Sequence, residues 1–293
     1  MNKLKIGISP IAWLNDDMPN LSKGITVEKC LSEIVKCGYT GVENCGSFPK
    51  DKNKIRKLLK KFNLKFSGGW HSANLIKNSV NSEFKKMKSI LEVFKEMKTK
   101  NIVFCETTDS IQGEKKNLSK RPSILDRDNK TYFLKLNELA KITKKKFNVN
   151  ICYHHHMGTL IQNEKEIDLL MKNTSKDVKL LLDTGHLIFA GIDPMKIYKK
   201  YYLRISHVHL KDIRKNILNK CIKNDLSFLR SFLKGVFTVP GDGFYNFRPL
   251  LNNLKKNNYN GWVIIEAEQD PKKYSPYIYS LMGYKNVKKI LKI

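Results

Sequence analysis

Short apolar runs and longer amphipathic segments alternate along the whole chain. The short runs are rich in β-branched residues and have the length of β-strands. Between them lie segments such as TVEKCLSEIVKCG and DKNKIRKLLKKFN, in which apolar positions recur every three or four residues, as in an amphipathic helix. The predicted strands are LKIGIS (4–9), TGVE (40–43), LKFSGG (64–69), NIVFC (101–105), VNICY (149–153), VKLLLD (178–183), RISHVHL (204–210) and WVIIEA (262–267).

The ends of two helical segments carry capping residues. Thr26 is expected to cap the start of the first helix, and Gly38 to end it. Asp51 and Asn63 play the same parts for the next one. Eight strands with helices between them predict an α/β fold of the (β/α)₈ TIM-barrel type, for which a length of 293 residues is ample. No linker divides the chain, so a single domain spanning 1–293 is expected.

Composition narrows the class of protein. No apolar stretch approaches the roughly 18 residues that a membrane-spanning helix needs, and the N-terminus lacks the apolar core of a signal peptide. We therefore expect a cytoplasmic protein with no membrane partner. The six cysteines are scattered without metal-binding spacing, so they predict neither a disulfide framework nor a thiolate metal site.

The formal net charge of +28 would ordinarily suggest nucleic acid as a partner. Only seven of the 55 basic residues are arginine, the side chain best suited to bidentate phosphate and base contacts. The lysines are spread over the predicted helices, which favours solvated faces over one binding stripe. We expect no specific nucleic-acid partner.

Candidate chemistry gathers at one end of the predicted barrel, the end at which βα loops carry the active site. Most of the histidines and several carboxylates stand at or just past strand ends: Glu43, Trp70, His71, Glu106, His154, His155, His156, Asp183, His186, His207, His209, Glu266 and Glu268. Imidazole and carboxylate ligands without thiolates predict a divalent metal site for Mn²⁺, Co²⁺, Mg²⁺ or Zn²⁺. His207 is interpreted as a hydrogen-bonded core residue one layer deeper.

The three consecutive histidines of YHHHMGT follow a strand whose side chains alternate between faces. His154 and His156 are predicted on the site face. His155 is predicted on the opposite face, together with Ile151 and Tyr153.

Six stretches, in matching order over roughly residues 4 to 275, resemble the inosose dehydratase family: GISPIAWLNDDMP, YHHHMGT, LLDTGH, HVHLKD, LKGVFTVPGDG and GWVIIEAEQDP. DTGH and HVHLKD occur across the wider superfamily of xylose-isomerase-like barrels, whereas WLNDDMP, the triple histidine and VPGDG with EAEQDP are more specific. The resemblance implies removal of water from 2-keto-myo-inositol, a small cyclitol ketone, in inositol catabolism.

The resemblance also implies a metal centre. Asp183, His209 and Glu266 match three ligands of the superfamily, and His154 stands where relatives have a ligand glutamate. Either His154 or a water is then the fourth ligand. Mn²⁺ or Co²⁺ is the implied metal, with Mg²⁺ or Zn²⁺ as alternatives. A thiol such as glutathione and a homo-oligomeric assembly are compatible with the family.

Dehydration of such a ketone requires an electrophile for the enolate and groups that move protons. Glu266 and His186 are the candidate proton carriers, and His156 and Lys211 are candidates for binding substrate oxygens. Substrate contacts are predicted for Trp13, Asn15, Asp16, Trp70 and Glu106. The structural alternatives are packing for the tryptophans and a simple loop turn for residues 15–17.

Other functions share parts of this pattern. A ketose or cyclitol isomerase or epimerase would use the same metal site and the same first step. An apurinic-site endonuclease would need more metal ligands than this chain offers. A barrel without catalytic activity would not need three residues that can bind a metal ion.

Overall fold

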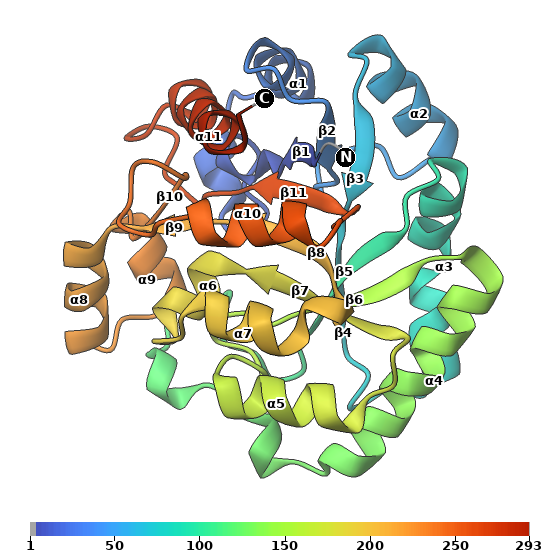
Figure 1. The fold of residues 1–293 in the computed structure, drawn as a ribbon. Coiled ribbons are helices and arrows are strands. Elements are labelled where there is room, and N and C mark those ends of the chain that lie inside the picture. Colours follow the sequence, from blue (N-terminus) through green and yellow to red (C-terminus); the bar gives the residue numbers. More distant parts are fainter. Residues whose placement is uncertain (1–3, 293) are drawn as a thin grey trace.

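The computed structural model describes residues 4–292 and confirms the barrel (Figure 1). The barrel strands are β1 (Lys5–Ile8), β2 (Gly41–Glu43), β3 (Lys65–Gly68), β4 (Trp70–Ala73), β5 (Asn101–Glu106), β6 (Asn150–His154), β7 (Val178–Asp183), β8 (Ile205–Leu210) and β11 (Trp262–Ile265). They form one parallel sheet in the order β3-β2-β1-β11-β8-β7-β6-β5-β4.

The third predicted strand continues farther than its sequence pattern indicates. β3 pairs with β2 and β4 pairs with β5, and only Gly69 separates the two. They therefore act as one bent barrel strand that joins the two edges of the sheet. At Gly69 a β-carbon would lie 2.9 Å from that of Asn44, so the bend requires glycine. The polar, partly exposed sequence WHSA gave no strand signal.

Helices surround the barrel (Figure 1). They are α1 (Val27–Lys36), α2 (Lys52–Lys61), α3 (Val80–Glu96), α4 (Asn129–Phe147), α5 (Glu164–Asn173), α6 (Thr184–Phe189), α7 (Pro194–Tyr201), α8 (Lys215–Lys223), α9 (Phe228–Leu233), α10 (Arg248–Lys256) and α11 (Pro276–Leu291). A short antiparallel pair, β9 (Asp212–Ile213) and β10 (Phe237–Thr238), follows β8 and was not predicted. None of the helices among residues 4–292 has the length and apolarity to cross a membrane.

The predicted helix caps are confirmed. The Thr26 side chain accepts a hydrogen bond from the Lys29 amide, and Asp51 accepts from the second and third amides of α2. Gly38 has a φ of +95°, and a β-carbon there would lie 2.8 Å from the Tyr284 ring. The first helix must therefore end with glycine if α11 is to pack against it.

Candidate functional site

A cavity of about 220 Å³ opens at the carboxyl ends of the strands. This volume suits a small ring, since pockets for drug-sized ligands begin near roughly 300 Å³. Its lining combines loop carboxylates, four histidines and one tryptophan: Ser9, Ile11, Asp16, Asp17, Glu43, Asn44, Cys45, Trp70, Ser72, Val103, Gln112, His154, His156, His186, His209, Glu266 and Glu268. The cavity is therefore where the barrel rule predicted the site.

The LLDTGH stretch folds so that one carboxylate serves two purposes. Asp183 ends β7 and is also the N-cap of α6, because its Oδ1 accepts a hydrogen bond of 2.9 Å from the His186 amide. The other oxygen, Oδ2, is buried and has no hydrogen-bond partner among the described residues. An unpartnered carboxylate oxygen in a buried site is available to bind a ligand such as a metal ion.

Two histidines direct donor atoms at this oxygen, and Glu266 directs one at the second of these histidines. Asp183 Oδ2 lies 3.4 Å from His154 Nε2 and 3.5 Å from His209 Nδ1. Glu266 Oε2 lies 2.5 Å from the same His209 nitrogen, yet neither atom completes a hydrogen bond. Donor atoms that share a metal ion at about 2.1 Å lie roughly 3 to 4 Å from one another. The spacing of the His154, Asp183 and His209 atoms, with the unpartnered Glu266 oxygen beside them, fits a divalent metal ion.

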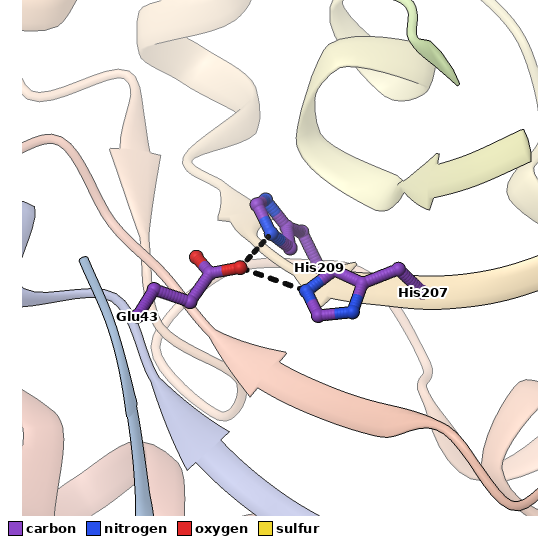
Figure 2. Close-up of side chains that lie close together, drawn as sticks. All are labelled: Glu43, His207 and His209. Atoms are coloured by element: carbon purple, nitrogen blue, oxygen red, sulfur yellow. Dashed lines mark hydrogen bonds and ion pairs between the residues drawn. The ribbon is translucent and has the colours of Figure 1, made fainter. Parts of the chain in front are cut away.

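Glu43 contacts the other ring nitrogen of His209, Nε2 (Figure 2). Its Oε1 lies 3.2 Å from His209 Nε2 and 2.7 Å from His207 Nε2. Burial would raise the pKa of Glu43, but the two histidines lower it well below its usual value. This carboxylate therefore orients His209 so that Nδ1 faces the metal donors, which is the arrangement that carboxylate partners give metal-binding histidines. His207 is a hydrogen-bonded core histidine, as predicted.

A second group of buried donors lies beside the first. His156, His186 and Glu268 each offer one atom, and these atoms lie within 4.8 Å of one another. The ammonium of Lys211 lies 2.7 Å from Glu268 Oε1 and 3.2 Å from His186 Nε2. Lys211 is fully buried and does not line the cavity.

Burial dominates the electrostatics of this second group. It raises the pKa of Glu268 to about 8, against the lowering effect of Lys211. It also lowers the pKa values of His156 and His186 well below their usual range, and Lys211 adds to both effects. Both imidazoles are therefore neutral at physiological pH.

The loop after β1 supplies two carboxylates at the mouth of the cavity. Both oxygens of Asp16 lie 3.0 Å from the Gly46 amide nitrogen, which ties this loop to the one after β2. Burial raises the pKa of Asp17 to about 6, although the charge of Lys211 opposes the shift. Asp17 is thus partly protonated near neutral pH.

The structure does not bring all the predicted substrate contacts to the cavity. Asp16 and Trp70 line it, whereas Trp13, Asn15 and Glu106 do not. The turn that begins at Pro10 directs Trp13 into the core, where its indole donates to Glu33 Oε2 at 2.6 Å. These three positions, and Lys211, lie outside the lining of the cavity.

Asn15 and Glu106 organise loops instead. Asn15 Oδ1 accepts a hydrogen bond from the Met18 amide. Glu106 is buried and accepts from the Leu75 and Thr108 amides and from the Thr108 hydroxyl.

The triple histidine divides between faces as the strand alternation predicted. His154 and His156 line the cavity. His155 is fully buried away from it, and its Nε2 accepts a hydrogen bond of 3.4 Å from the Asp183 amide. Its neighbours in the strand, Ile151 and Tyr153, belong to the main hydrophobic core.

Two residues of the site had no role assigned from the sequence, Glu43 and Glu268, and Asp17 was considered only for substrate contact or a loop turn. Glu43 and Glu268 were both recognised as residues near strand ends, which is the signal that could have found them. Asp17 stands in the WLNDDMP stretch next to the predicted Asp16, but no local pattern distinguishes the two carboxylates.

Comparison with known proteins places the chain among barrels of this kind. The xylose isomerase-like TIM barrel family matches residues 31–281. Inosose dehydratases of Clostridium tetani and Geobacillus thermodenitrificans are 40% and 41% identical, covering 98% and 96% of this chain and 97% and 95% of the relatives. The rhizopine catabolism protein MocC of Rhizobium meliloti is 38% identical over 97% of this chain and 87% of its own.

Two solved structures share the fold at low sequence identity. The probable 3-DHS dehydratase AsbF of Bacillus anthracis superposes with a TM-score of 0.71 at 14% identity, over 96% of this chain and 98% of AsbF. The IOLI protein with a bound zinc atom gives 0.67 at 15% identity, over 98% of this chain and 96% of IOLI. At these identities the likeness concerns the fold alone.

Proposed function

The chain belongs to the inosose dehydratase family of xylose isomerase-like TIM barrels, and from this premise we propose a metal-dependent hydro-lyase. It removes water from 2-keto-myo-inositol to give a trihydroxycyclohexane-dione in inositol catabolism. The observation that carries the proposal is the convergence of four buried donors, two of them unpartnered carboxylate oxygens, beside a cavity that His154, His209 and Glu266 line. The chain matches inosose dehydratases over nearly their whole length.

In this proposal His154, Asp183, His209 and Glu266 hold the metal. Two imidazoles and two carboxylates suit Mn²⁺, Co²⁺ or Zn²⁺ better than Mg²⁺, which prefers oxygen ligands. We propose Mn²⁺ or Co²⁺, as the family resemblance implies. When bound, the ion would supply Lewis-acid stabilisation to the negative charge that develops on the ketone oxygen. The thiol that the resemblance allows stays a prediction.

Proton transfers are assigned to two carboxylates. Burial raises the pKa of Glu266, but the charges of Lys211 and His209 lower it below its usual value, so the ionised group accepts the proton from the carbon beside the ketone. Asp17, with a pKa of about 6, donates a proton to the departing hydroxide. His156, His186 and Trp70 form the wall that orients the ring.

The reaction type is decided by the mass of the product. Purified protein incubated with 2-keto-myo-inositol and Mn²⁺ or Co²⁺ is expected to give a product lighter by one water molecule. A product of unchanged mass would instead favour the isomerase or epimerase alternative, which returns the proton to the same enolate.

The triple histidine gives a prediction with built-in controls. His154→Ala is expected to lower metal affinity by about 10-fold or more, by analogy with the loss on disturbing metal-site partners. His156→Ala is expected to impair turnover or substrate binding, and His155→Ala to lower the melting temperature. Calorimetric Mn²⁺ titration of the three variants measures the difference. Loss of metal in the His155 variant with retention in the His154 variant would mean that the ligand assignment is wrong.

Glu43 gives a second prediction. Glu43→Gln removes the charge that holds His209 Nε2 and is expected to lower metal affinity about 10- to 100-fold. The matched control is Glu83→Gln, because Glu83 is also buried and lies 2.8 Å from a histidine, His71, outside the cavity. Equal metal affinity in the Glu43 variant and wild type, measured by the same titration, would exclude this orienting role.

A further inference from the structure

The ammonium of Lys211 stands where a second metal ion would be expected. Two imidazoles and one carboxylate, from His156, His186 and Glu268, are a ligand set typical of catalytic zinc sites. Lysine has three donors and no lone pair, so the Glu268 oxygen beside it acts as an acceptor, and His186 Nε2 accepts in the tautomer that carries its hydrogen on Nδ1. The same lone pairs would bind a metal ion.

His156 also presents a lone pair to this group. Its Nδ1 lies 2.8 Å from the carbonyl oxygen of Met157, which can only accept a hydrogen bond. Nδ1 therefore carries the hydrogen, and Nε2 carries the lone pair. In addition, Glu268 Oε2 is buried without a partner among the described residues. The lysine alone therefore does not provide a hydrogen-bond partner for every metal-binding atom of this group.

Contacts with the DTGH segment position Lys211. The Thr184 hydroxyl accepts a hydrogen bond from the Lys211 amide at 2.9 Å and donates to its carbonyl at 2.8 Å. A β-carbon on Gly185 would lie 2.6 Å from the Lys211 side chain, so glycine leaves the space for the aliphatic stem. The ammonium also lies 5.1 Å from the centre of the Phe237 ring, within reach of a cation–π contact.

The position of the ammonium agrees with a fixed second cation. The carboxyl groups of Asp183, Glu266 and Glu268 lie in one buried region with Lys211. The ammonium lies 3.5 Å from Asp183 Oδ2 and 3.5 Å from Glu266 Oε2, so it compensates both donor groups. Without the lysine, this buried region would lose the positive charge that faces the three carboxyl groups.

We propose that His156, His186 and Glu268 form a second cation site whose built-in occupant is Lys211, so that the chain is restricted to one exchangeable metal ion. Removal of the amine opens this site to a divalent metal such as Zn²⁺. The inference goes beyond the proposed reaction, because it concerns how many cations the site holds, whichever substrate it takes.

The test counts metal ions. Chelator-treated wild type and Lys211→Ala are loaded with Zn²⁺, passed through a desalting column and analysed by mass spectrometry for metal content. We expect the variant to hold one more ion per chain than wild type, and Lys211→Ala/Glu268→Gln to return to the wild-type count. The control is Lys135→Ala, whose ammonium bonds only backbone carbonyls, at Leu75, Ile76 and Asn78. An unchanged count in folded Lys211→Ala would overturn the proposal.

A measurement on wild type covers the case in which the variant does not fold. Anomalous scattering from wild-type crystals in excess Zn²⁺ is expected to show no metal between His156, His186 and Glu268, and a metal there would overturn the proposal. Failure of the proposed reaction is a separate result, because it appears as absent turnover in wild type and leaves these metal counts unchanged.

Discussion

Asp183→Asn is expected to lower turnover by about 10³-fold or more, because Lewis-acid stabilisation contributes several kcal/mol and each 1.36 kcal/mol is about tenfold. The asparagine oxygen can still cap α6, where Asp183 Oδ1 now accepts from the His186 amide. Only the charged second oxygen is lost. Metal affinity is therefore expected to fall by at least about 100-fold, more than for the loss of an outer partner, while the metal-free protein stays folded.

Calorimetric Mn²⁺ titration and initial rates measure both effects. The matched control is Asp193→Asn, since Asp193 caps α7 through the Met195 amide and, among the described residues, belongs to no group of possible metal ligands. That variant is expected to keep wild-type metal affinity and turnover. Wild-type metal affinity in Asp183→Asn would remove Asp183 from the ligand set.

Asp17→Asn is expected to lower turnover by about 10²-fold, the lower end of the usual contribution from general acid catalysis. The group must be protonated to act, and burial raises its pKa to about 6. Wild-type turnover is therefore expected to fall as pH rises above about 6, when the protonated fraction declines. The asparagine variant cannot titrate, so this decline should disappear from its pH profile of kcat.

Asp16→Asn is the comparison for this experiment. Asp16 lines the same cavity but accepts from the Gly46 amide, so its loss should loosen the loop and raise KM. The decline above pH 6 should remain. A decline that persists unchanged in Asp17→Asn would assign the proton to another group.

Local sequence patterns predicted most of the strands and helices of the fold. Strand runs, helix periodicity and caps such as Thr26 and Asp51 depend on neighbouring residues, so the sequence carries them directly. Parallel strands in a barrel end on the same side, so the predicted fold placed Asp183, His209 and Glu266 at one edge.

The parts that were missed depend on contacts between distant segments. Glu43 acquires its role only by meeting His207 and His209, 164 and 166 residues farther along the chain. The direction of Trp13 depends on Glu33, and the path of Lys211 depends on the missing β-carbon of Gly185. No period or spacing within one segment carries that information.

The proposed reaction requires a single metal ion bound by His154, Asp183, His209 and Glu266. Crystals grown with Mn²⁺ and measured at wavelengths on either side of the manganese absorption edge locate that ion directly. We expect one anomalous peak within about 2.0 to 2.3 Å of His154 Nε2, Asp183 Oδ2, His209 Nδ1 and Glu266 Oε2. A peak between Glu43, His207 and His209, which also offer donor atoms within 4.8 Å of one another, would contradict this ligand assignment.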